Sequence, residues 1–170
     1  MKSLSLVLLV PLLFSSAAFG QTKSIYTSLL AKDCVASKEP VVDGYSGICK
    51  GTNAYALEFL EGDLRQTINV IAPNKKKYEL NLWTNVSSGF SSLGEKAEWR
   101  VQGKKPTALI VRYNASENPE DSSKITSYLV VAKITASEVC IVDIIKPSKT
   151  QNVDARKVAD VASKSTCKFQ

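Results

Sequence analysis

The segment from Pro106 to Pro147 most constrains how this chain can fold. It holds three apolar runs rich in β-branched residues, Thr107–Tyr113, Ile125–Ile134 and Val139–Ile145, with polar, turn-forming segments between them. Short apolar runs bounded by turn-forming residues predict consecutive antiparallel strands. The middle run is apolar at successive positions as well as alternate ones, so we expect its strand to lie at the centre of a sheet.

Five further strands are predicted upstream, because alternating apolar and polar residues recur there between turn signals. They cover Tyr45–Lys50, Ala54–Leu60, Leu64–Ile71, Lys77–Trp83 and Ala97–Gln102. The segment Ser24–Leu30 fits either a short strand or one helical turn, and we favour a strand over Ile25–Thr27. We expect Asp33–Gly44 to be irregular.

The C-terminal segment differs in kind, because its apolar residues recur at helical spacing. Ala155, Val158, Val161 and Ala162 predict a helix over Asn152–Ser163, with a small apolar face that would be marginal alone in water. The predicted fold is therefore mainly β. It is an antiparallel meander of about eight strands, closed into a barrel or folded into a sandwich, with one C-terminal helix and disulfide ties.

Residues 1–20 have the pattern of a secretory signal peptide. Lys2 gives a positive start, Leu4–Phe14 gives an apolar stretch, and Ala18-Phe19-Gly20 gives a small-residue cleavage site. The apolar stretch is shorter than the roughly 20 residues that span a bilayer, and no other segment is apolar enough to cross one. We therefore expect an exported protein in which residues 21–170 form a single β-rich domain.

The four cysteines of an exported chain predict two disulfides. Three pairings are possible, and we favour Cys34–Cys49 and Cys140–Cys167, because each closes a local loop at one end of the domain. A zinc site would need closely spaced cysteines or histidine partners, and the sequence contains no histidine. We expect neither a metal nor a cofactor.

The formal net charge is +6, without a long run of Lys or Arg and without an Arg-rich helix. We therefore interpret the charge as a solvated basic surface and do not expect nucleic acid as a partner.

In a simple meander, successive connections alternate between the two ends of the sheet. One end then collects the Lys-rich turns Lys50–Asn53, Pro73–Lys77, Gly103–Lys105 and Thr135–Ser137. The other end collects the acidic connections Glu61–Asp63, Thr84–Glu95 and Asn114–Lys124.

The candidate binding residues lie mainly in the connections of the acidic end, because long loops on a rigid sheet often carry function. In the segment Trp83–Trp99, two tryptophans bracket a Ser- and Gly-rich loop that carries Phe90. Exposed aromatics beside small polar residues suit contact with a sugar, a peptide or a partner protein. The alternative is that these aromatics are core residues at strand ends. The complete candidate set is Trp83, Phe90, Trp99, Asp63, Glu117 and Glu120.

Catalytic motifs are scarce in this sequence. Without histidine there is no Ser-His or Cys-His nucleophile system, and no GxSxG motif or glycine-rich phosphate loop occurs. Our leading hypothesis is a non-enzymatic module that binds an envelope protein or polymer. One alternative is a hydrolase that uses carboxylates such as Asp63 and Glu98. Another is a barrel that carries a small apolar ligand, unless Tyr55, Phe59 and Trp99 fill its interior.

Several short motifs run through nearly the whole chain after the leader: YTSL…DC, GICKG, EGDLRQ, NLW…GFSSLGEKAEWR and IVRYNASENPE. With them the chain resembles a group of small exported bacterial proteins to which no function is assigned. The resemblance implies one domain and a periplasmic or secreted location, and it brings no catalytic residues. In outline, the expected fold is also similar to that of periplasmic lysozyme inhibitors, which are small disulfide-tied β-barrels. This second likeness concerns the fold alone.

Overall fold

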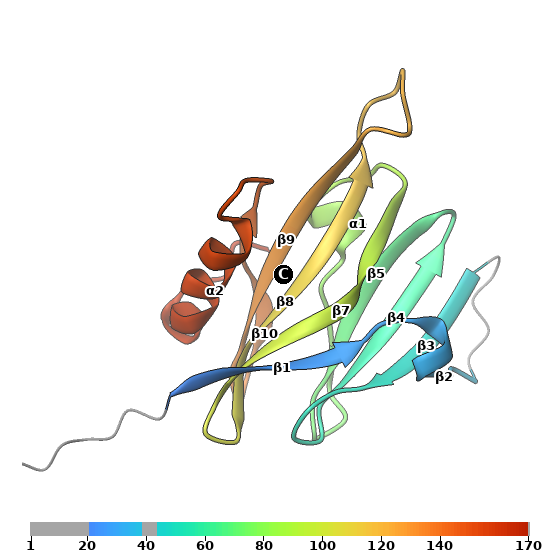
Figure 1. Cartoon of the computed structure of the whole chain (residues 1–170). Coiled ribbons are helices and arrows are strands. Elements are labelled where there is room, and N and C mark those ends of the chain that lie inside the picture. Colours follow the sequence, from blue (N-terminus) through green and yellow to red (C-terminus); the bar gives the residue numbers. More distant parts are fainter. Residues whose placement is uncertain (1–20, 39–43, 170) are drawn as a thin grey trace, which may run out of the picture.

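The computed structural model describes residues 21–38 and 44–169, which form two antiparallel sheets and a C-terminal helix (Figure 1). Sheet A has the strand order β1-β7-β8-β9-β10, and sheet B has the order β2-β3-β4-β5-β6. The strands are β1 (Thr22–Ser28), β2 (Cys34–Ala36), β3 (Gly44–Lys50), β4 (Ala56–Gly62), β5 (Arg65–Ile71), β6 (Lys77–Glu79), β7 (Ser91–Gln102), β8 (Lys105–Ser116), β9 (Ile125–Ile134) and β10 (Val139–Ile145). The helical elements are η1 (Ala31–Asp33), α1 (Leu82–Asn85), α2 (Gln151–Val161) and η2 (Ala162–Lys164).

In the described part of the chain, β1 belongs to sheet A, the strands β2 to β6 form sheet B, and β7 to β10 return to sheet A. Strand β1 pairs with β7 over its whole length, from Thr22 opposite Gln102 to Ser28 opposite Lys96. Strands β2 to β6 pair in chain order, and so do β7 to β10. The predicted antiparallel, mainly β fold with one C-terminal helix is therefore confirmed.

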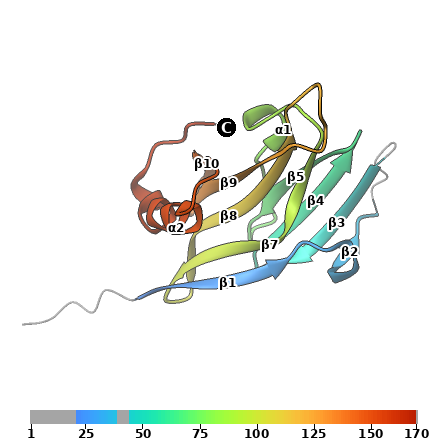
Figure 2. The same ribbon diagram turned by 45° about the horizontal axis from the view of Figure 1, so that its top comes forward.

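The main core lies between the facing surfaces of the two sheets, as the two views show (Figures 1 and 2). Alternation along the strands selects which side chains enter it: in β4, Leu57 and Phe59 belong to this core. The indole of Trp99 meets the ring of Tyr55 at a centroid distance of 6.0 Å. The largest fully buried side chains are Trp99, Tyr113, Leu57, Ile68, Leu80, Leu82, Leu109, Ile134 and Ile141.

Helix α2 covers the other face of sheet A and forms a second, smaller core with it (Figure 2). The buried face of the helical segment consists of small side chains, Ala155, Ala159 and Ala162. Side chains of β8, β9 and β10 complete this cluster: Ala108, Ile110, Leu129, Val131, Cys140 and Val142. Because alanine buries little apolar area, the helix depends on further ties to the sheet.

Both predicted disulfides are confirmed. Cys34 and Cys49 stand directly opposite each other on β2 and β3, with their Cα atoms 4.2 Å apart. Cys140 and Cys167 join β10 to the tail beyond α2, with their Cα atoms 5.7 Å apart. The backbone N–H of Lys168 donates to the carbonyl of Ile141 at 2.8 Å, so the tail is fixed along β10.

The predicted number of strands is wrong, and of the two predicted arrangements, a barrel or a sandwich, the structure has the second. The described chain has ten strands, not eight, and they form two packed sheets, not a closed barrel or one continuous meander. The return of the chain from sheet B to β7, which pairs with β1, produces this arrangement. Strand β2 falls in a segment expected to be irregular. Its three residues pair with β3 beside the Cys34–Cys49 disulfide, a tertiary constraint that side-chain patterning does not show.

The predicted strand Lys77–Trp83 is also too long. It ends at Glu79, because Asn81 takes a left-handed conformation with φ of 46° and α1 begins at Leu82. Strand β7 then starts at Ser91, so most of the expected loop between Trp83 and Trp99 is strand. A register shift between Leu93 and Ala97 breaks the alternation there, which explains why the pattern predicted a loop.

Some of the sequence predictions concern residues that the structure does not describe. The predicted signal peptide, residues 1–20, lies outside the described ranges, as do positions 39–43 of the segment expected to be irregular. None of the helices in the described ranges is long and apolar enough to cross a membrane.

Candidate functional site

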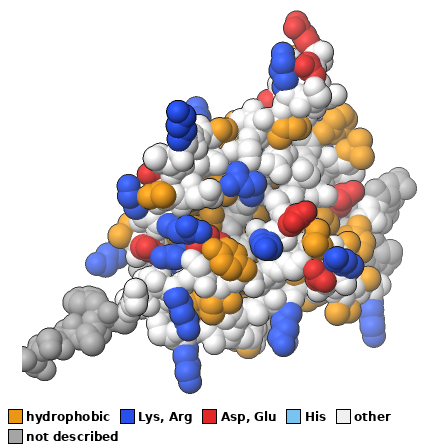
Figure 3. All heavy atoms as spheres, viewed as in Figure 1, with side chains coloured by type: hydrophobic (Ala, Val, Ile, Leu, Met, Phe, Trp, Pro, Cys, Tyr) orange, Lys and Arg blue, Asp and Glu red, His pale blue; other side chains and the backbone are white. Residues whose placement is uncertain are grey.

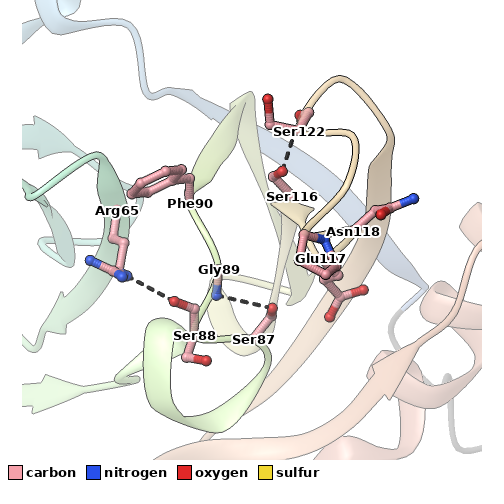
Figure 4. A pocket seen from close by; sticks show the side chains of 10 residues that line it. Arg65, Ser87, Ser88, Gly89, Phe90, Ser116, Glu117, Asn118 and Ser122 are labelled. Atoms are coloured by element: carbon pink, nitrogen blue, oxygen red, sulfur yellow. Dashed lines mark hydrogen bonds between the residues drawn. The ribbon is translucent and has the colours of Figure 1, made fainter.

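Three connections meet at one end of the molecule, which we call the rim. They are the β4–β5 turn (63–64), the α1–β7 loop (86–90) and the β8–β9 loop (117–124). A groove of about 420 Å³ lies at the rim (Figure 4). It is lined by Arg65, Ser87, Ser88, Gly89, Phe90, Ser116, Glu117, Asn118, Pro119 and Ser122. The structure thus brings two of the candidate residues, Phe90 and Glu117, to one site.

Neighbouring strands fix the backbone of the α1–β7 loop. The Tyr113 hydroxyl of β8 donates to the carbonyl of Ser87 at 2.8 Å, and Arg65 Nε of β5 donates to the carbonyl of Ser88 at 2.8 Å. Burial raises the pKa of Tyr113 above its ordinary value, so the hydroxyl keeps the proton that it donates. The floor of the groove is therefore anchored to both sheets.

Gly89 allows the α1–β7 loop to approach β8 closely. A Cβ atom added at Gly89 would lie 2.2 Å from the carbonyl oxygen of Ser116, a distance that no side chain tolerates. The backbone N–H of Ser116 in turn donates to the carbonyl of Phe90 at 2.8 Å. The two walls of the groove are thus joined through main-chain contacts.

Phe90 is held in place and still reaches solvent. Its side chain is 49% exposed, and the guanidinium of Arg65 lies 5.5 Å from the ring centroid. Arg65 also forms an ion pair with the exposed carboxylate of Asp63. A cation beside part of the ring restrains the aromatic side chain and leaves the remainder free to contact a partner. Asp63 therefore contributes to the site by positioning Arg65.

Glu117 is an oriented carboxylate on the opposite wall of the groove. The Tyr128 hydroxyl donates to its Oε2 at 2.8 Å. Burial raises the pKa of Glu117, but hydrogen bonds from Tyr128, Ser87 and Thr126 and the charge of Lys146 outweigh that effect and lower it. The side chain is consequently a fixed anion at neutral pH.

The β8–β9 loop beyond Glu117 is organised by its own side chains. The Asn118 Oδ1 accepts the backbone N–H of Glu120 at 2.9 Å, and Asp121 Oδ1 accepts that of Ser123 at 3.1 Å. These are short Asn and Asp turns of the kind that shape loops without a core. Glu120 is exposed and does not line the groove.

The rim also exposes apolar side chains. Leu64 is 66% exposed in the β4–β5 turn, and Ile125 is 54% exposed where the β8–β9 loop enters β9. Each of the three connections therefore has an exposed apolar residue in it or next to it, with Phe90 in the α1–β7 loop. Figure 3 shows hydrophobic side chains near this upper end of the molecule, below the charged tip of the β8–β9 loop. Apolar residues within a polar border are typical of protein interaction surfaces.

The two tryptophans of the candidate set do not reach the groove. Trp99 is 0% exposed and its Nε1 donates to Thr27 Oγ1 at 2.9 Å, so it belongs to the core, as the alternative interpretation expected. Trp83 is half-buried in α1 and is not among the residues that line the groove. We therefore remove Trp99 from the candidate binding set.

The carboxylates of the hydrolase alternative lie in different sheets and have different partners. Asp63 pairs with Arg65 in the β4–β5 turn of sheet B. Glu98 lies on β7 of sheet A and pairs with Arg156 of α2. The structure therefore does not assemble them as an acid/base pair.

Sequence reasoning missed several residues that build the groove, above all Arg65, Ser87, Ser116 and Asn118. Polar residues next to turns are common on any protein surface, so these positions carry no pattern that separates them from a solvated loop. The expectation that acidic connections share one end was the useful signal. This expectation identified the connections that form the rim, but it did not identify Arg65, the cationic side chain that lies between them.

One group of side chains in the described ranges has the spacing of metal ligands: Glu138, Cys140 and Cys167. The two sulfur atoms are bonded to each other as a disulfide, so neither is available as a thiolate ligand. This group therefore does not provide the chemistry that a metal centre needs.

The fold and the rim define a two-sheet antiparallel β protein with a surface groove as its candidate site. Comparison with protein-family models, with curated proteins and with solved structures finds no match.

Proposed function

We propose that this chain is an exported, non-enzymatic interaction module that binds a partner protein at its rim. The observation that carries the proposal is Phe90, an aromatic side chain held half-exposed at the edge of a groove whose backbone is fixed from both sheets. Aromatic side chains that need little further ordering are effective anchors in interfaces.

The apolar and charged residues of the rim indicate what kind of partner it suits. Leu64 and Ile125 extend the apolar area beyond Phe90, which favours a protein surface over a soluble sugar. The three rim connections contain the acidic residues Asp63, Glu117, Glu120 and Asp121 and the basic residue Lys124, and Arg65 lies beside them at the start of β5. We infer a partner that presents apolar side chains within a basic border, since complementary charge favours association.

The two disulfides support export, because such bonds form and persist in oxidising compartments. The leader-like residues 1–20 and the resemblance to small exported bacterial proteins support the same location. We therefore place the module in the bacterial periplasm or outside the cell.

The interior argues for a binding module over a carrier of apolar ligands. Trp99, Phe59 and Leu57 pack in the main core between the sheets, and Tyr55 packs against that core. A carrier needs an interior that side chains leave open. The three aromatics named for that alternative instead fill the space between the sheets.

Site-directed photo-crosslinking in cells tests this function. A crosslinkable residue placed at Phe90 or Leu64 should trap one defined protein, whereas the same residue at Val153, an equally exposed position on α2, should not. The purified partner should then bind Phe90→Ala about thirtyfold more weakly than wild type, since interface anchors are worth roughly 2 kcal/mol or more. Equal trapping from the rim and from Val153 would contradict the proposal.

A further inference from the structure

A second pocket, of about 170 Å³, lies on the outer face of sheet A beside the first turns of α2. It shares no residue with the groove at the rim. Its lining comprises Tyr26, Lys96, Glu98, Ile110, Arg112, Leu129, Asn152, Ala155 and Arg156. Three of these side chains are cationic and one is anionic, so the pocket has an excess of positive charge.

The single carboxylate of the pocket is already neutralised. Arg156 donates from Nε and Nη2 to the two oxygens of Glu98 at 2.7 and 3.0 Å, and Ser24 Oγ donates at 2.5 Å. Burial raises the pKa of Glu98, but these hydrogen bonds and the charges of Arg156 and Arg100 outweigh burial and lower it. Glu98 is therefore a permanent partner of Arg156 and leaves the other two cations uncompensated.

Arg112 is fixed by neutral groups only. Its Nη1 donates to Ser127 Oγ at 2.8 Å and to Gln151 Oε1 at 3.1 Å, and its Nη2 donates to Asn152 Oδ1 at 3.3 Å. Within the described ranges, no carboxylate forms an ion pair with Arg112 or with Lys96. A guanidinium has five N–H donors, so Arg112 retains donors and its full charge.

The neighbouring strand leaves room for Arg112. A Cβ atom added at Gly94 of β7 would lie 2.8 Å from the Cβ of Arg112, so only glycine fits beside this side chain without a shift. Because Val111 of β8 faces the main core, Arg112 points to the face that carries α2, and Lys96 lines the pocket on the same face. Figure 3 shows Lys and Arg side chains over this part of the molecule.

We propose that this pocket binds a phosphate group between Arg112 and Lys96. A phosphate carries up to two negative charges, which match the two uncompensated cations, and a guanidinium recognises its oxygens through paired N–H donors. Tyr26 adds a donor at the edge, since its hydroxyl oxygen accepts Arg156 Nη2 at 3.2 Å and its own proton remains available.

The phosphate has two possible sources, inorganic phosphate and the headgroup of an anionic phospholipid, which share this chemistry. A titration of the full chain with inorganic phosphate at constant ionic strength, followed by NMR, tests the site. Amide shifts should concentrate at residues 26, 96, 112 and 152. Lys96→Gln should weaken phosphate binding about tenfold, the effect of losing one charge-assisted hydrogen bond.

The matched control is Lys157→Gln, which removes the same charge from an exposed position of α2 that does not line the pocket. It should change phosphate affinity by less than about twofold, the effect of a screened surface charge. Arg112→Lys keeps the positive charge but removes the paired N–H donors of the guanidinium, so it should weaken phosphate binding several-fold. Circular dichroism should show that the fold of this variant is intact. Equal effects of Lys96→Gln and Lys157→Gln would overturn the proposal, as would shifts spread over other residues.

Vesicles distinguish the two sources of phosphate. Binding to phosphatidylglycerol vesicles but not to phosphatidylcholine vesicles, with a selective loss in Lys96→Gln, identifies the lipid headgroup. Site-specific binding of inorganic phosphate without a difference between the vesicles identifies soluble phosphate. If Lys96→Gln alters neither phosphate nor vesicle binding, the pocket is not a phosphate site.

Discussion

The guanidinium of Arg65 lies 5.5 Å from the ring centroid of Phe90 and so connects β5 of sheet B to the loop that enters β7 of sheet A. Two hydrogen bonds to backbone carbonyls reinforce this connection. Arg65 Nε donates to the carbonyl of Ser88 at 2.8 Å, and the N–H of Ser91 donates to the carbonyl of Leu64 at 3.0 Å. The groove at the rim is therefore positioned by the packing of one sheet against the other.

Replacement of Phe90 by alanine should cost little stability. The side chain is half-exposed and loses one cation–π contact, worth about 0.5–1 kcal/mol at an exposed site. Trp99→Ala, which empties part of the core, should cost about 3–5 kcal/mol. Urea denaturation of both variants measures the difference. A loss above about 3 kcal/mol for Phe90→Ala would identify Phe90 as a core residue.

Replacement of Cys167 by serine should loosen the C-terminal tail more than the sheet. The tail beyond α2 is held by the Cys140–Cys167 disulfide and by backbone contacts to Ile141, while the fully buried apolar side chains of the helix are alanines. Hydrogen exchange should therefore rise from Asn152 onward, whereas the central strand β9 keeps its protection. Equal protection of the tail in both proteins would show that its packing and the ion pair between Arg100 and Asp160 suffice.

Acid should destabilise the junction between α2 and sheet A through Glu98. Its pKa in the folded protein lies below the ordinary value of 4.5, so folding favours the charged form. This contribution is complete above about pH 4.5 and is lost as the pH falls through the lower, folded-state value. Chemical denaturation across this range should show a weaker acid-induced loss in Glu98→Gln than in wild type.

Glu120→Gln is the control for the acid experiment. Glu120 lies in the β8–β9 loop, and its carboxylate forms no ion pair within the described part of the chain. Its variant should therefore follow the wild-type curve. If Glu98→Gln and wild type lose the same stability on acidification, the ion pair between Glu98 and Arg156 does not make the expected contribution to the free energy of unfolding.

The sequence predicted the parts of this fold that depend on local patterning. The strands Ile125–Ile134 and Val139–Ile145 have the predicted bounds, because continuous apolar runs between turn-forming residues mark buried strands clearly. Strand β7 was shortened because the register shift before Ala97 interrupts alternation, and β2 was missed because a disulfide partner stabilises it. In each case a tertiary contact decided the structure.

The candidate site was predicted less well, for a related reason. Phe90 and Glu117 could be proposed because an aromatic residue and an acidic loop are visible in the sequence itself. Arg65 could not be proposed, because its role arises from the ring of Phe90 in the loop that enters the other sheet. The same holds for Arg112, whose neutral partners come from β9 and α2.

Replacement of Gly89 by alanine should distort the rim while leaving the core intact. The added methyl would lie 2.2 Å from the carbonyl oxygen of Ser116, so the α1–β7 loop or the end of β8 must move, at a cost of about 1–3 kcal/mol. The hydrogen bond from Ser116 N–H to the Phe90 carbonyl should weaken, and exchange of that amide should accelerate. Gly62→Ala is the control, since a Cβ there meets nothing within 4 Å. If Gly89→Ala leaves the Ser116 amide as protected as Gly62→Ala does, the close approach of loop and strand does not shape the groove, and the rim is more adaptable than its contacts imply.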